Sequence, residues 1–299
     1  MSGEQITTDA RIYDVGYRSY DGPRKGPAWA LVTIWRHTVQ RVLGLHRSFR
    51  HKVLPGLALV IAFVPALIFV GIAAFLTVDP AHEEVLPSYA EYTGFITLAL
   101  VLFSALVAPE ALCTDRRTGM LDLYLAGPLD VTRYLAAKWA AVASVTLLMT
   151  AGPELFLLGA YAVENHGPSV TDTPLLLLRI MVAGIGVALF FTSVSMAVSS
   201  LTTHRAVAAV AIVLVLLVPT IVAAVAVESS GAPDEVTLAT PAVATEFAWR
   251  VFGQAHDPAD DGPAIRHVST PLVVMGLLGW VALGAGVSLL SYRRQGRRR

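Results

Sequence analysis

Two charged side chains inside long apolar runs are the residues of this sequence best placed to do chemistry. Glu154 and Arg179 are surrounded by Ala, Val, Leu and Ile. Charges inside a membrane are costly, and they usually pair with each other, relay protons or line a substrate path. Glu154 lies shortly before the outer end of one predicted helix, and Arg179 lies shortly after the outer start of the next. At about 1.5 Å of rise per residue, both are roughly 8–13 Å deep in the membrane. We therefore predict a contact between them, direct or water-bridged. It would either pin two helices together or make a substrate path polar.

The sequence lacks the motifs of the common hydrolases and ATPases. His82, Glu83 and Glu84 lack the second histidine of H-E-x-x-H, and no G-x-S-x-G elbow occurs. No G-x-x-x-x-G-K-[ST] phosphate loop is present, so ATP hydrolysis would need another chain. Cys113 is the single cysteine, which excludes an intrachain disulfide and a cysteine metal centre. We predict no catalytic residue, metal site or cofactor in this chain.

The composition is that of a membrane protein. Of 299 residues, 55% are hydrophobic and 15% charged, whereas soluble domains average about 25% charged residues. The net charge is zero, which gives no reason to expect a nucleic-acid partner. Residues 1–27 are polar and do not have the pattern of a cleaved signal peptide. The first membrane span is therefore expected to be retained.

Six apolar runs are long enough to cross a bilayer as helices, for which about 20 residues are needed. They are 53–78, 92–112, 136–161, 174–200, 206–227 and 271–291. The fold class predicted is all-α, integral to the membrane. Most of the 22 Lys and Arg residues precede the first run, follow the second run or lie in the tail. By the positive-inside rule, both ends of the chain lie in the cytoplasm. We divide the chain into an arm and elbow helix (1–52), a membrane domain (53–291) and a basic tail (292–299).

Residues 28–52 have the periodicity of a basic amphipathic helix. Val32, Trp35, Val39 and Val42 follow a three-four spacing on one face, and basic residues occupy the other. Such a helix lies along the inner membrane surface. It would be either a plain anchor or an elbow that also contacts a cytoplasmic partner. The residues assigned to it are Trp35, Arg36, Arg41 and Arg47.

The stretch between the second and third runs has the most distinctive order of residues. A charged cluster at 115–117 precedes Gly119, a short helix carrying Leu121, Tyr124 and Leu125, and a stop at Gly127-Pro128. Asp130 or Thr132 can cap the following helix. A short helix held between two spans can transmit force from a cytoplasmic machine. An ordinary basic connector is the alternative.

This order resembles the permeases of ABC-2 type transporters. They carry here an acidic–basic cluster, Gly-Thr, an acidic residue before leucines, a proline, and a Lys that enters the third span. The matching residues are Asp115, Arg116, Arg117, Gly119, Asp122, Leu123, Leu125, Pro128 and Lys138. Met120 replaces the usual Thr, and Asp replaces Glu at 115 and 122. Residues 13–24 are similar to the N-terminal signature of bacterial members.

The resemblance implies the transmembrane subunit of a bacterial exporter for an amphiphilic or lipid-like substrate. A separate ATPase subunit, which binds ATP and Mg, would dock on residues 114–130 and on the elbow helix. A second permease copy or a related chain would complete the dimer in the bacterial cytoplasmic membrane. Two alternatives stay open: a signalling or scaffold partner of an ATPase that moves no cargo, and a membrane enzyme built around Glu154.

Two further features are predicted from the residues. Thr240 as N-cap, Pro241 and Gly253 predict a short helix within the outer segment 228–270. It is either one of the family's short outer helices between the fifth and sixth spans or a soluble loop helix. Thr192, Ser195 and Ser199 form a hydroxyl stripe on one helix face. Such a stripe allows close helix packing or lines a pathway.

Overall fold

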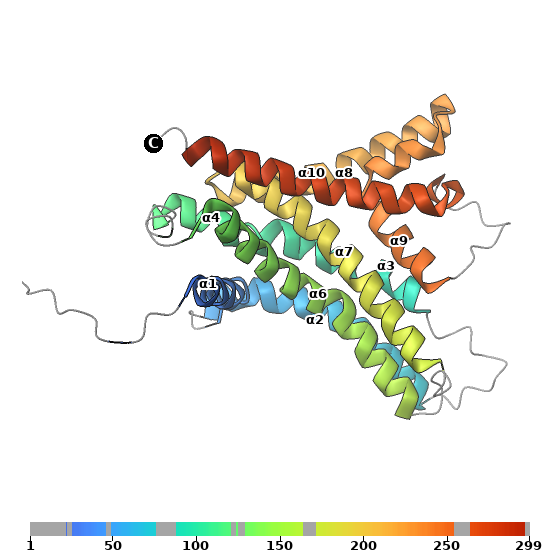
Figure 1. The fold of residues 1–299 in the computed structure, drawn as a ribbon. Helices are drawn as coiled ribbons and strands as arrows, with labels where there is room; N and C mark the ends of the chain where they lie inside the picture. Colours follow the sequence, from blue (N-terminus) through green and yellow to red (C-terminus); the bar gives the residue numbers. More distant parts are fainter. Residues whose placement is uncertain are drawn as a thin grey trace, which may run out of the picture.

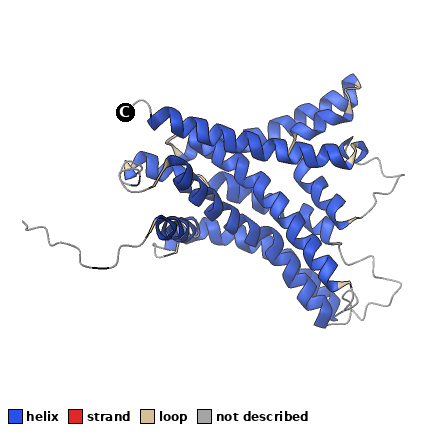
Figure 2. Cartoon of the chain, viewed as in Figure 1, coloured by secondary structure: helices blue, strands red, loops and turns tan. Residues whose placement is uncertain are grey.

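The structure is a computed structural model that describes residues 22, 26–45, 49–75, 88–120, 124, 129–163, 172–253 and 264–296. Over these ranges the chain is helical, and no strand occurs in them (Figure 2). Six helical segments are long and apolar enough to cross a membrane: Lys52–Ala74, Tyr89–Arg117, Val131–Val163, Thr173–Leu201, Arg205–Ser230 and Thr270–Arg294. The predicted all-α class and the six candidate spans are confirmed.

The described residues form the following helices in chain order. They are α1 (Pro27–Val42), α2 (Phe49–Phe75), α3 (Tyr89–Leu102), the π-helical turn η2 (Phe103–Val107), α4 (Glu110–Arg117), α6 (Val131–Val163), α7 (Thr173–Leu201), α8 (Arg205–Ser230), the 3₁₀ turn η3 (Asp234–Ala239), α9 (Ala242–Phe252), the 3₁₀ turn η4 (Ala264–His267) and α10 (Thr270–Gly296).

The two ends of the bundle carry different elements (Figure 1). At one end lie α1, α4 and the C-terminal end of α10, and we call this the α1 side. At the other end α9 is inserted among the spans, and we call this the α9 side. Helix α1 is seen end-on while the long helices run across the view, so α1 crosses the bundle rather than extending it.

Helix α7 is the central element, and it contacts α6, α10 and α9. Small residues permit the close approach. A Cβ on Gly184 would lie 2.9 Å from Ala151 Cβ of α6, and a Cβ on Gly284 of α10 would lie 2.6 Å from the Ser193 carbonyl oxygen. Both distances are shorter than a normal contact, so glycine is required where these helices cross.

The amphipathic segment is not one helix, which corrects the prediction for 28–52. Helix α1 ends at Val42, and α2 already begins at Phe49. Gly44 adopts φ 67°, and Leu45 N–H donates to the Gln40 carbonyl at 2.8 Å. Glycine enters this left-handed conformation at little cost and so ends helices. The apolar spacing in the sequence continues past Gly44, so a prediction from that spacing gives a helix that is too long.

The second span also differs from the prediction of a helix over 92–112 followed by a loop. After α3, the π-helical turn η2 inserts before Pro109, and helix α4 then carries the charged cluster. Asp115, Arg116 and Arg117 thus occupy the last turn of a helix that is continuous with the span. Thr118 ends it, and Gly119 adopts φ 71°.

A short helix is present within 228–270. Helix α9 stops at Gly253, which adopts φ 69°. Its start lies one residue later than predicted, because Pro241 is the N-cap while Thr240 Oγ1 accepts from Ala242 N–H at 3.3 Å. Phe247 lies so close to α7 that a Cβ on Gly186 would approach its ring to 2.2 Å. The helix is therefore packed into the bundle rather than lying on a free loop.

Candidate functional site

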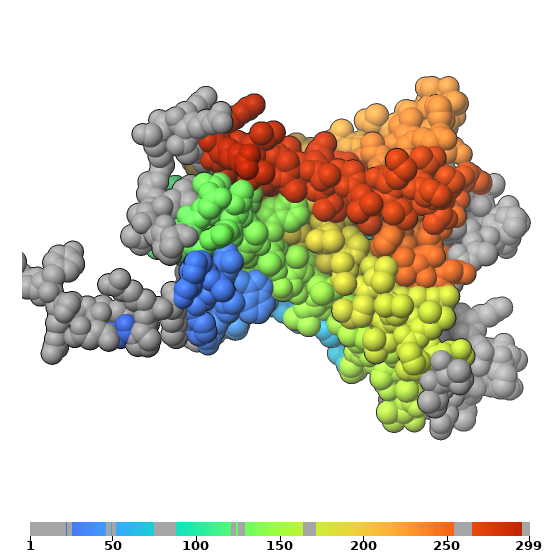
Figure 3. Space-filling view, viewed as in Figure 1, coloured from blue at the N-terminus to red at the C-terminus, as the bar shows by residue number. Residues whose placement is uncertain are grey.

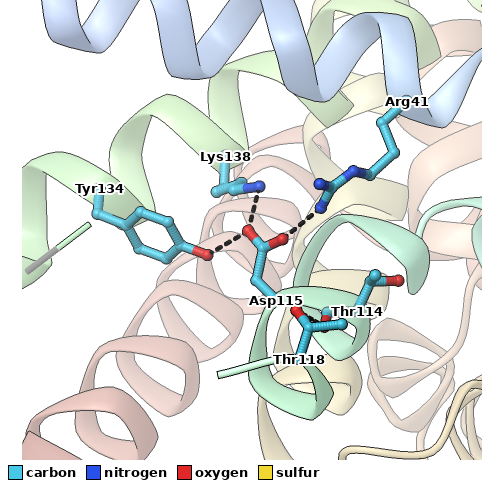
Figure 4. A network of polar contacts seen from close by, with 6 residues as sticks. All are labelled: Arg41, Thr114, Asp115, Thr118, Tyr134 and Lys138. Carbon is cyan, nitrogen blue, oxygen red and sulfur yellow. Dashed lines mark hydrogen bonds and ion pairs between the residues drawn. The ribbon is translucent and has the colours of Figure 1, made fainter. Parts of the chain in front are cut away.

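A buried carboxylate connects three helices on the α1 side (Figure 4). Asp115 of α4 forms ion pairs with Arg41 of α1 and with Lys138 of α6, whose Nζ lies 2.6 Å from Asp115 Oδ2. The Tyr134 hydroxyl donates to the same oxygen at 2.8 Å. We call Asp115, Arg41, Lys138 and Tyr134 the Asp115 hub.

The hub is almost closed to solvent. Asp115 and Tyr134 are completely buried and Lys138 is 2% exposed, whereas Arg41 keeps partial access to water. Burial is the largest influence on the pKa of Arg41 and by itself would lower it. Attraction to Asp115, the hydrogen bond to that carboxylate, and the nearby Tyr124 and Glu110 together leave that pKa above its ordinary value. Because each buried charge has an opposite partner, the network is stable only with all its members in place.

The residues around Asp115 fix α4 to the end of α7. The Arg116 guanidinium donates to the Ser200 carbonyl and, at 3.1 Å, to the Thr202 carbonyl. Ser291 of α10 donates to the same Ser200 carbonyl at 2.6 Å. The Ser200 and Thr202 carbonyls at the end of α7 are thereby satisfied. Through Asp115 and Arg116, helix α4 is tied to α1, α6 and α7, and through Ser200 to α10.

The structure divides the predicted coupling residues into internal and exposed ones. Among the predicted coupling residues that the structure describes, Asp115 is inside, Arg116 is half-buried, and only Arg117 and Gly119 are exposed. Asp115 is therefore not available for direct contact with a partner protein in this conformation. The remaining predicted coupling residues, Asp122, Leu123, Leu125 and Pro128, lie outside the described residues, as does Arg47 of the predicted elbow helix.

Two of the other predicted elbow residues, Arg36 and Arg41, flank a groove on α1. It has a volume of about 910 Å³ and is lined among others by Trp29, Arg36, Arg41 and Tyr124. Trp35 points elsewhere, and its indole N–H donates to Ser144 Oγ of α6 at 3.2 Å. The groove combines aromatic surface with positive charge, next to the exposed end of α4.

The predicted pair of Glu154 and Arg179 is not in direct contact. Glu154 Oε1 accepts from the Thr93 hydroxyl of α3 at 3.1 Å. Arg179 donates instead to the Phe252 carbonyl, at the end of α9, at 2.9 Å. The prediction placed both residues near the same end of adjacent helices but could not assign their faces. Arg179 faces α9, and the place of this short helix beside α7 cannot be read from the sequence.

The hydroxyl stripe lies within the packed interior. Thr192, Ser195 and Ser199 are at most 1% exposed. Ser195 donates to the Thr192 carbonyl at 3.1 Å within the same helix. In this conformation these residues line no open path, and their small size serves the contact between α7 and its neighbours.

Tyr134 was not assigned to the site from the sequence, and Lys138 entered only as part of the family match. A signal was present, because residues four apart share one face of a helix. Tyr134 and Lys138 have this spacing directly after the charged cluster. That their common face meets Asp115 depends on how α4 and α6 pack.

Comparison with known proteins gave a family match. The family model described as ABC-2 family transporter protein matches residues 73–238, more than half of the 299-residue chain. The match includes α3, α4 and α6 to α8, and therefore most of the Asp115 hub. A search of curated proteins gave no match. With six helices able to cross a membrane and this family match, the chain belongs to the ABC-2 transporter family and is a multi-pass transmembrane transport subunit.

Proposed function

We propose that this chain is the permease of an ATP-driven exporter in the bacterial cytoplasmic membrane, with the α1 side facing the cytoplasm. A separate ATPase subunit, which holds ATP and Mg, docks on that side, and a second permease copy or related chain completes the pathway. The substrate is an amphiphilic or lipid-like molecule. ATP-driven closure of the ATPase subunits would shift the permease between its conformations through their differential affinity for nucleotide.

The Asp115 hub is the observation that carries this proposal. A machine that pushes on the exposed end of α4 needs a stiff connection into the membrane helices. Asp115 and Arg116 provide it, because they bind α4 to α1, α6 and the end of α7. A plain basic connector would need no such buried network of ion pairs.

The docking surface would be the exposed turn at Arg117 and Gly119 together with the groove on α1. Arg36 and Arg117 give this surface a positive charge, which favours an acidic partner surface. In Figure 3 the surface of α1 adjoins that of the α6 start at the same end of the molecule. The α4 turn lies beside α1 as well, because Arg41 of α1 pairs with Asp115 of α4 and Tyr124, which follows the turn, lines the groove. One partner protein could therefore contact both segments.

The exposed apolar surface of this chain is the basis for proposing a second permease chain and an amphiphilic substrate. Most residues of α8 are exposed, with a wide aliphatic face that includes Val210, Leu214, Leu217 and Ile221. Such a face requires lipid or another membrane helix. The groups exposed on it are aliphatic, which suits the apolar part of an amphiphile.

Purification of the chain from its native membrane in mild detergent tests the proposal. Mass spectrometry should identify an ATP-binding subunit in the complex. Arg117→Glu should remove that subunit, because it reverses charge on the proposed docking surface. Arg294→Glu is the matched control, since Arg294 is exposed at the end of α10 on the same side and lies off that surface.

The outcome also separates the alternatives. Copurification with an ATPase and nucleotide-stimulated movement of a fluorescent lipid in proteoliposomes would support the exporter. An ATPase complex that moves no amphiphile would favour a scaffold or signalling role. Recovery without an ATPase, from a complex shown to survive the detergent, would overturn the proposal.

A further inference from the structure

Four acidic side chains are buried among the described residues, and they differ in how their charge is compensated. Arg205 Nη2 of α8 lies 3.3 Å from Glu110 Oε2 of α4. Asp115 has Lys138 Nζ at 2.6 Å, and Glu246 of α9 has Arg250 Nε at 2.6 Å. Glu154 of α6 is 1% exposed and accepts one hydrogen bond, from Thr93. Its second oxygen, Oε2, has no hydrogen-bond partner among the described residues. Glu154 therefore differs from the other three, each of which has a basic partner.

The groups around Glu154 carry no compensating charge. Helix α3 contributes Thr93, Tyr89 and Tyr92, and the Tyr92 hydroxyl donates to the Ala62 carbonyl of α2 at 2.6 Å. Tyr161 lies on α6 itself. No Lys, Arg or His within the described ranges forms an ion pair with Glu154.

Among the described residues, no basic group on the helices packed against α6 pairs with Glu154, and Lys52 at the start of the α2 span is exposed. On α7, Arg179 donates to the Phe252 carbonyl. Helix α1 and α4 meet α6 at the Asp115 hub, and Tyr292 of α10 lies against Tyr134 there. Tyr134 and Glu154 are some 30 Å apart along α6, at about 1.5 Å per residue. The hub therefore cannot neutralise Glu154.

An ionised carboxylate in this position would be a buried charge without a partner, which is far more costly than a buried neutral acid. A metal ion would not solve the problem, because hard cations need about six oxygen ligands and only Thr93 contacts this carboxyl among the described residues. A proton requires no additional space and leaves Oε1 free to accept from Thr93.

We propose that Glu154 is a proton-binding site of the membrane domain, which holds its proton while α3 and α6 are packed together and releases it when they separate and water reaches the carboxyl. Proton release and uptake would then accompany any change in the packing of α3 against α6. This proposal concerns the chain alone and does not depend on an ATPase partner.

Infrared difference spectroscopy of the full chain in lipid nanodiscs at neutral pH tests the protonation state. The wild-type spectrum should contain the C=O stretching band of a protonated carboxylic acid. That band should be absent in Glu154→Gln, in which a neutral amide keeps the size and the Thr93 contact. Glu246→Gln is the matched control, and it should retain the band because Glu246 is paired with Arg250. A wild-type spectrum without the band, or a band retained in Glu154→Gln, overturns the proposal.

A second variant keeps the test valid if Glu154→Gln does not fold. Thr93→Val removes the hydroxyl that donates to Oε1 and conserves side-chain volume. The C=O band should move to higher frequency, since the carbonyl loses its hydrogen bond. An unchanged band would show that the protonated acid is not Glu154 and would refute the assignment.

Labelling with a hydrophobic carbodiimide gives an independent readout. These reagents attack protonated carboxyl groups within the lipid phase. Peptide mapping should find the adduct on Glu154 and not on Asp115 or Glu246, and alkaline buffer should reduce the yield. Equal labelling of all three acids, or none on Glu154, would contradict the proposal.

Discussion

Lys138 on α6 lies 2.6 Å from Asp115 on α4, and neither side chain reaches solvent to more than 2%. This contact joins the end of the second span to the start of the third. Arg41 and Tyr134 complete the site from two other directions (Figure 4). The connection is therefore a junction of three helices rather than a surface feature, and variants at the junction should differ from variants at the neighbouring exposed residues.

Asp115→Asn should destabilise the folded chain by about 3–5 kcal/mol, because it leaves Lys138 and Arg41 without a negative partner. Denaturant-dependent unfolding in detergent micelles measures this loss. The double variant D115N/K138M should recover part of it, since one unpaired charge is removed. A single variant within about 0.5 kcal/mol of wild type would refute the assigned role of the hub.

Substitutions of the adjacent Arg116 and Arg117 should differ in their effect on stability. Arg116→Gln should cost about 1.5–3 kcal/mol, as hydrogen bonds from a charged donor to the Ser200 and Thr202 carbonyls are lost. Arg117→Gln should leave stability unchanged, because Arg117 is exposed. Thermal unfolding of both variants in the same detergent checks the contrast. Equal losses would show that Arg116 does not hold the end of α7.

Gly284→Ala should destabilise the α7–α10 contact by about 1–3 kcal/mol, because the new methyl group would overlap the Ser193 backbone. Gly279→Ala in the same helix is the matched control, since nothing lies within 4 Å of its Cβ position. It should be neutral or stabilising, as alanine favours helix more than glycine does. Unfolding midpoints of the two variants compare the sites directly. A Gly284→Ala protein as stable as Gly279→Ala would contradict the close crossing of α7 and α10.

Glu154→Gln and Arg179→Gln should have additive effects on stability. Glu154 contacts Thr93, and Arg179 contacts the Phe252 carbonyl, so they share no hydrogen-bond partner. The interaction energy from a double-mutant cycle should stay below about 0.5 kcal/mol. A larger value would restore the direct or water-bridged pair that the sequence suggested.

Asp130 should make the start of α6 sensitive to acid. Hydrogen bonds from the Thr132 hydroxyl and the Val131 N–H, the latter at 2.8 Å, lower the pKa of this carboxyl. A lowered pKa stabilises the fold above the carboxyl's ordinary pKa, and this contribution is lost as pH falls through the folded-state value. Hydrogen-exchange protection in the first turn of α6 should fall in that acid range. Asp130→Ala should be weakly protected at every pH. Equal protection in the variant and wild type would show that Asp130 does not cap α6.

The amino-acid sequence alone determined the six candidate spans and their approximate ends. Each span is an apolar run long enough to cross a bilayer, and this requirement does not depend on what the helix contacts. Local stop signals were equally readable, as Gly253 illustrates, because a left-handed residue ends a helix by itself. The family could also be inferred, because its motif is an order of residues along the chain: a charged cluster, then Gly119, then Lys138.

Only the tertiary structure decided which side chain meets which. The sequence pattern predicted a partner for Glu154 in Arg179, but α9 packs beside α7 and its terminal carbonyl accepts from that guanidinium. Likewise, the cluster at 115–117 indicated a surface, whereas the packing of α1 and α6 encloses Asp115. The physical reason is that spacing fixes the height and face of a residue on its own helix. The rotation and distance of the neighbouring helix depend on glycines such as Gly184 and Gly284, whose effect appears only when two helices are brought together.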